Sequence, residues 1–118
     1  MSVSQTSIAT NSKYGLHPSD LDHLMSVFKR HPSISQAILF GSSTLGNYKA
    51  GRDVDIALQG TLALSKEMKE IRFLLDEEGP LPYQIGLLVW SDITNEELKR
   101  YIQRVGVPIY QKNNPNIL

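Results

Sequence analysis

The chain has 118 residues, with 12 Lys and Arg against 12 Asp and Glu, 41% hydrophobic residues and no cysteine. This length predicts a single domain, and the balanced charge argues against an extended grip on nucleic acid, which needs a basic excess. The lack of cysteine excludes disulfide scaffolds, thiolate metal sites and cysteine nucleophiles, and it fits a cytoplasmic location. No apolar run in the sequence approaches the roughly 18 residues that a membrane-spanning helix needs.

The N-terminal part of the chain predicts a tail followed by a helix. Residues 1–13 are rich in Ser and Thr and predict a flexible tail, before one domain over residues 14–112 and a C-terminal tail over 113–118. A helix is predicted from Pro18, with Ser19 as its cap, until His31-Pro32 ends it. Its apolar stripe has helical spacing: Leu21, Leu24, Met25 and Phe28.

Short apolar runs predict the strands. Residues 37–40 are fully apolar, and residues 54–58 alternate between apolar and other side chains, so each run predicts a strand. Residues 83–90 are nearly all apolar and predict a third strand in the centre of the sheet. A short strand at 107–110 is expected at an edge, because Pro108 cannot donate a hydrogen bond.

Two more helices are predicted between these strands. One carries the stripe Leu64, Met68, Ile71 and Leu75 and ends at Gly79-Pro80. The other begins with a capping box of Thr94 and Glu97 and ends at Gly106, and its stripe is Leu98, Tyr101, Ile102 and Val105. The element order predicts an α/β (α+β) domain, in which about three helices flank a short mixed sheet.

The connection between the first two strands is the unusual segment. Residues 41–52 contain three glycines and several small polar residues. Connections of this kind usually have about two to six residues, so a longer one is a candidate for function.

Two carboxylates follow this connection. Asp53 and Asp55 are two apart on a predicted strand, so both point to one face and repel unless a cation, a shared proton or water intervenes. Mg²⁺ prefers one or two carboxylates together with substrate phosphates, and a glycine-rich backbone with Lys49 and Arg52 can hold those phosphates. The pattern favours a metal–phosphate site, although two alternating aspartates alone also fit a solvated strand face.

The combined motif resembles a known family. Phe40-Gly41-Ser42, followed after ten residues by Asp53-Val54-Asp55-Ile56, is similar to the signature of the minimal nucleotidyltransferases of the DNA polymerase beta-like superfamily. The resemblance implies that Gly41 and Ser42 hold nucleotide phosphates, with Ser43, Lys49 and Arg52 beside them. It also implies that Asp53 and Asp55 are the catalytic ligands of Mg²⁺.

The same resemblance implies an activity and a partner. Members of the family transfer a nucleoside monophosphate, often AMP from ATP, to a hydroxyl group, and pyrophosphate leaves. Several members lie beside HEPN-domain ribonuclease toxins and act as antitoxins that modify a toxin tyrosine. The resemblance therefore implies a nucleoside triphosphate substrate, a protein hydroxyl as acceptor and a HEPN-type partner.

The chain departs from the family pattern at three places. Ser43 stands where the family usually has Arg, and Arg52 stands where a Ser is common. In the third strand, Gly86 occupies the place of a third metal-binding Asp, and Val89 occupies the following acidic position. Two functions stay open on this evidence: a nucleotidyltransferase, or a degenerate antitoxin subunit that binds nucleotide and partner with little catalysis.

Overall fold

The computed structural model describes residues 16–41, 53–77 and 84–112. The two predicted tails and the connection over residues 42–52 lie outside these ranges. Within the described ranges, no helix is long and apolar enough to cross a membrane.

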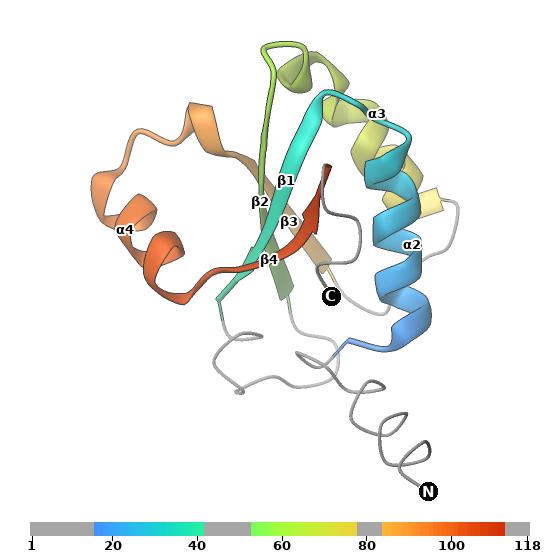
Figure 1. Cartoon of the computed structure of the whole chain (residues 1–118), viewed down its shortest axis with the longest axis horizontal. Helices are drawn as coiled ribbons and strands as arrows, with labels where there is room; N and C mark the ends of the chain where they lie inside the picture. Colours follow the sequence, from blue (N-terminus) through green and yellow to red (C-terminus); the bar gives the residue numbers. More distant parts are fainter. Residues whose placement is uncertain (1–15, 42–52, 78–83, 113–118) are drawn as a thin grey trace, which may run out of the picture.

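The described elements form an α+β domain (Figure 1). The helices are α2 (Pro18–Lys29), α3 (Leu64–Glu77), a short 3₁₀ helix, η2 (Trp90–Asp92), and α4 (Glu96–Val105). The strands are β1 (Ile34–Phe40), β2 (Asp53–Gly60), β3 (Gln84–Val89) and β4 (Val107–Gln111). Over the part of the chain that is described, three α-helices flank a four-stranded mixed sheet, which confirms the predicted fold class.

The sheet has the strand order β3-β2-β1-β4. Strand β1 is antiparallel to both β2 and β4, whereas β2 and β3 are parallel and are joined through α3. The prediction that β4 is an edge strand is confirmed. The prediction that the third strand is central is wrong, because β3 forms the opposite edge of the sheet.

One face of the sheet carries the main hydrophobic core. Helices α2 and α3 lie side by side over this face (Figure 1). Alternate residues of β2 and β3 point into it, and the helices contribute the stripes that the sequence predicted. Its strand residues include Val54, Ile56, Leu58, Ile85, Leu87 and Val89, and its helix residues include Leu24, Phe28, Leu64, Ile71 and Leu75.

Helix α4 lies on the opposite side of the sheet from α2 and α3 (Figure 1). A smaller cluster joins it to the second sheet face through Phe40 and Ala57, with Ile93 and Ile102 buried beside them. The predicted stripe of α4 packs here as expected. This second face therefore has helix cover at one end of the strands and carries the predicted functional residues at the other.

Two helix caps differ from the predicted ones. The N-cap of α4 is Asn95, whose side chain accepts a hydrogen bond from the Leu98 N–H at 3.1 Å, so Thr94 is not the cap. The N-cap of α2 is His17, whose Nδ1 accepts from the Ser19 N–H at 3.1 Å. Helix α2 begins at Pro18 as predicted, and only its capping side chain differs, whereas the cap of α4 lies one residue after the predicted one. In each case a nearby polar side chain satisfies a free N–H group.

Candidate functional site

Asp55 lies at the meeting point of three strands. It pairs with Phe40 at the end of β1 and with Gly86 in β3. Because side chains alternate along a strand, Asp55 shares the sheet face of Ala57, which packs toward α4. Asp55 is half-buried there. Among the described helices, α4 is the one that packs on the sheet face of this carboxylate (Figure 1).

Gly41 lies against one oxygen of this carboxylate. Its φ of +90° is a conformation that side chains rarely adopt, so glycine is needed at the end of β1. A Cβ atom at position 41 would lie 3.0 Å from Asp55 Oδ2. The first glycine of the sequence motif and the second aspartate are thus brought into direct contact.

Gly86 lies against the other oxygen. A Cβ atom at position 86 would lie 2.8 Å from Asp55 Oδ1. The Asp55 carboxylate is therefore placed between Gly41, which directly follows β1, and Gly86 in β3. Position 86, where the family pattern has a third carboxylate, is paired with Asp55 in the sheet. In this protein the Asp55 side chain lies close to the backbone of Gly86.

The remaining predicted site residues are placed only in part. The backbone of Asp53 pairs with that of Gln84 at the start of β2, and the Asp53 side chain lies outside the described part of the structure. Ser42, Ser43, Lys49 and Arg52 also lie outside it. Strand order and register bring Gly41, Asp55 and Gly86 together, whereas the contribution of the other residues stays a prediction.

Metal binding can be tested against the donors that are described. Among the described residues, no group of three or more His, Cys, Asp or Glu side chains is placed to hold a metal ion. A set limited to Asp53 and Asp55 still suits Mg²⁺, which is usually held by one or two carboxylates and completes its shell with water and substrate phosphates. These two carboxylates therefore fit an ion that arrives with a nucleotide.

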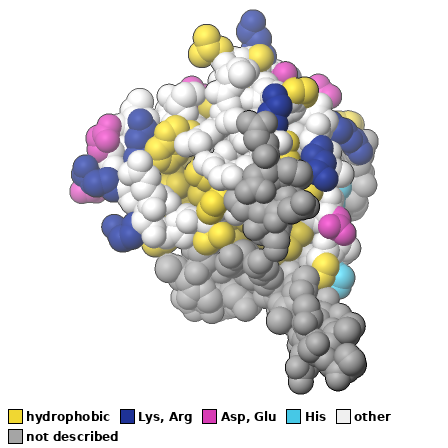
Figure 2. Space-filling view, viewed as in Figure 1, with side chains coloured by type: hydrophobic (Ala, Val, Ile, Leu, Met, Phe, Trp, Pro, Cys, Tyr) yellow, Lys and Arg dark blue, Asp and Glu magenta, His cyan; other side chains and the backbone are white. Residues whose placement is uncertain are grey.

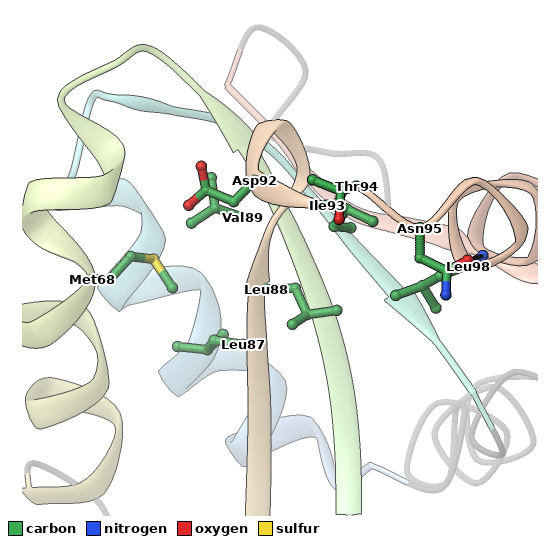
Figure 3. A pocket seen from close by; sticks show the side chains of 9 residues that line it. All are labelled: Met68, Leu87, Leu88, Val89, Asp92, Ile93, Thr94, Asn95 and Leu98. Carbon is green, nitrogen blue, oxygen red and sulfur yellow. Dashed lines mark hydrogen bonds between the residues drawn. The ribbon is translucent and has the colours of Figure 1, made fainter.

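A separate pocket of about 450 Å³ lies around the edge of β3 (Figure 3). Its apolar wall comes from α3, β3, α4 and the segment between η2 and α4, and Asp92, Thr94 and Asn95 add polar groups. The apolar lining residues are Met68, Leu87, Leu88, Val89, Ile93 and Leu98. Sequence reasoning missed this pocket, because its wall is assembled from segments that have no common motif.

Charges of both signs are interspersed on the visible described surface (Figure 2). Helix α4 itself carries Glu96 and Glu97 in its first turn and Arg104 in its last. On this face the described side chains therefore form no extended basic surface of the kind that grips a nucleic-acid backbone.

Comparisons with known proteins identify the family. A search of curated protein sequences found no match. Two solved structures have similar folds. One is a toxin-antitoxin with AMP-PNP, with a TM-score of 0.56 and 16% sequence identity; the match covers 77% of this chain and 73% of the other. The second is a Sulfolobus solfataricus protein named as a candidate nucleotidyltransferase, with a TM-score of 0.54 and 14% identity; the match covers 98% of this chain and 92% of the other. A sequence model of the family described as "Polymerase beta, Nucleotidyltransferase" matches residues 22–115. The chain belongs to this polymerase beta nucleotidyltransferase family.

Proposed function

We propose that the protein transfers a nucleoside monophosphate, AMP from ATP, to a hydroxyl group of a partner protein in a reaction that requires Mg²⁺. The observation that carries this proposal is the contact between Gly41 and Asp55. It brings the first glycine of the glycine-serine motif against the second aspartate, in a chain of the nucleotidyltransferase family.

Each residue has a role in this proposal. Asp53 and Asp55 hold Mg²⁺, which when bound neutralises charge on the triphosphate. The backbone at Gly41 and Ser42 holds phosphate oxygens, and Ser43, Lys49 and Arg52 add hydrogen bonds and positive charge around them. The acceptor oxygen forms a bond to the α-phosphorus, the bond to the leaving pyrophosphate breaks, and Asp55 is a described carboxylate that can accept the hydroxyl proton.

The partner in this proposal is a HEPN-type toxin, toward which the protein acts as an antitoxin. Two observations support it: the motif resembles that of minimal nucleotidyltransferases, and one solved structure of similar fold is a toxin-antitoxin with AMP-PNP.

Gly86 favours a second candidate function. Because the neighbour of Asp55 in β3 has no carboxylate, nucleotide and Mg²⁺ can bind while transfer is weak or lost. In that case the protein is an antitoxin subunit that acts by binding its partner. The two candidates share the nucleotide site and differ in whether a covalent product forms.

The test uses ATP labelled at the α-phosphate, Mg²⁺ and the partner that co-purifies with the full chain. Wild type is expected to label the partner, and Asp53→Ala is expected to abolish labelling while Asp92→Asn, a change in an exposed carboxylate beyond β3, leaves it intact. Binding of Mg·ATP without labelling supports the second candidate. If wild type does not bind Mg·ATP at all, both candidates are wrong.

A further inference from the structure

The two edges of the sheet differ in how readily they accept another strand. At one edge, β4 contains Pro108, which has no N–H group, and its register with β1 shifts between Ala37 and Ile38. Both features discourage further pairing. At the other edge, β3 contains no proline and no charged residue, and its register with β2 is regular along its length. Within the described ranges, the edge of β3 is therefore open to a further strand.

The pocket at this edge has apolar walls on both sides of β3 (Figure 3). Met68 and Leu87 line it on the side of α3, whereas Leu88 and Leu98 line it on the side of α4. A strand that joins a sheet directs its side chains alternately to the two faces. One added strand would therefore bring side chains to both walls of the pocket and would cover Leu88, which is 37% exposed.

The backbone of β3 indicates where such a strand can bond. Arg72 Nη1, on α3, donates to the Ile85 carbonyl at 3.1 Å, so this edge carbonyl already has a partner near the start of β3. Because backbone groups alternate in direction along a strand, those of Leu87 point to the same side as those of Ile85. Among the described residues, no group outside β2 bonds to the backbone of Leu87. The N–H and C=O groups of Leu87 are thus placed to pair with another chain.

Two opposite charges stand at the two ends of this edge. Arg72 lies beside the start of β3, as its bond to Ile85 shows. Asp92 follows the end of β3 in η2, and Ser65 in the first turn of α3 donates to its Oδ2 at 3.5 Å. Both charged side chains are exposed, and about two turns of α3 separate Ser65 from Arg72. A strand that runs antiparallel to β3 and carries the same charges in the same order would place each charge near its opposite.

We propose that the edge of β3 binds the β3 edge of a second copy of this chain. The two strands run antiparallel and exchange N–H···O=C bonds at Leu87, so the two sheets join into one. A two-fold axis then brings Arg72 of each copy toward Asp92 of the other. One pair of short strands is a small interface, so we expect a weak dimer with a Kd of roughly 10–100 µM. This association does not depend on the proposed nucleotide transfer.

The first test is sedimentation equilibrium of the full chain, without nucleotide, between about 5 and 500 µM, a range that spans the expected change from monomer to dimer. Asp92→Lys and Arg72→Glu are each expected to weaken self-association by about tenfold or more, because like charges then face each other. An equal mixture of the two variants restores both opposite-charge contacts and is expected to regain wild-type affinity. Asp22→Lys, the same kind of charge change on an exposed residue of α2, is expected to leave the dimer unchanged.

The second test needs no substitution, so it holds even if a variant does not fold. Amide hydrogen exchange of the wild type is measured by NMR at both ends of the same concentration range. The Leu87 amide is expected to exchange at least about threefold more slowly at the high concentration, whereas amides of β4 keep their rates. A wild type that stays monomeric, as it would if this edge took up a strand of another protein instead, overturns the proposal. So does a mixture of folded charge variants that does not associate, or a Leu87 rate that is independent of concentration.

Discussion

Asp55→Asn tests whether the site lowers the stability of the free protein in order to bind a cation. Asp53 and Asp55 are two residues apart in β2, so their Cα atoms are about 6.6 Å apart at the usual rise of a strand. Two like charges at this separation repel by about 0.6 kcal/mol in water and by about 2.5 kcal/mol at an effective dielectric constant of about 20. Because Asp55 is half-buried, we take about 1 kcal/mol, so the metal-free variant is expected to unfold about 4 °C above wild type.

The assay is urea denaturation at pH 7 and low salt, without metal and then with Mg·ATP. In the wild type, Mg·ATP at 100 times its Kd is expected to add about 2.7 kcal/mol to the free energy of unfolding, and Asp55→Asn is expected to lose this gain. Asp92→Asn is the matched control and is expected to stay within about 0.5 kcal/mol of wild type in both conditions. The reasoning is refuted if metal-free Asp55→Asn is less stable than wild type, or if it keeps the full stabilisation by Mg·ATP.

Three further predictions concern the fold. Ile102→Ala removes a side chain that is 1% exposed between α4 and the sheet, and it is expected to lower the free energy of unfolding by about 3 kcal/mol in urea denaturation. Asn95→Ala removes the cap of α4 and is expected to cost about 1 kcal/mol in the same assay, whereas Thr94→Ala is expected to cost little; the reverse order would restore the sequence-based cap. Burial raises the pKa of Tyr110, so unfolding favours the phenolate and stability is expected to fall as the pH rises above about 10. Tyr110→Phe should reduce this fall in urea denaturation between pH 8 and 11, and an unchanged slope would contradict the assignment.

Local patterns predicted most elements of this fold. Helical spacing located α2, α3 and α4, and the alternation in residues 54–58 correctly assigned Val54, Ile56 and Leu58 to the main core. These patterns predict elements because each helix or strand buries one face, and its apolar residues therefore recur with the period of that helix or strand. The caps His17 and Asn95 were missed, because more than one polar residue lies around each helix start and only the backbone geometry selects among them.

Strand order was not available from local patterns. The apolar run of β3 predicted a central strand, yet it arises because Ile85, Leu87 and Val89 face the core under α2 and α3. On the other face, Leu88 is 37% exposed at the sheet edge. The hydrophobicity of a strand indicates how much of each of its faces is buried. It does not indicate how many neighbouring strands are hydrogen-bonded to it. The order of strands depends on the crossover through α3, which is a long-range property.

The candidate site was likewise predictable only in part from local sequence patterns. The spacing of Gly41 and the two aspartates made them candidates, whereas the proximity of Asp55 to Gly86 depends on the register of two strands that are far apart in the sequence. Comparison of the sequence with the family motif correctly identified that position 86 lacks a carboxylate. The sequence did not indicate that the Asp55 carboxylate lies where a side chain of residue 86 would otherwise be. The pocket at the edge of β3 was invisible for a related reason, since four separate elements line it.

The two faces of the sheet have different roles, so the fold of the family and its catalytic activity depend on different residues. The main-core residues of β2 and β3 lie on the α2 and α3 face, whereas Asp55 and Gly86 lie on the other. A change from carboxylate to glycine on this second face removes no core contact, so selection for stability does not oppose it. The fold can therefore match the nucleotidyltransferase family whether or not transfer persists. For this chain, the decisive evidence is where the Asp55 carboxylate lies and what it binds.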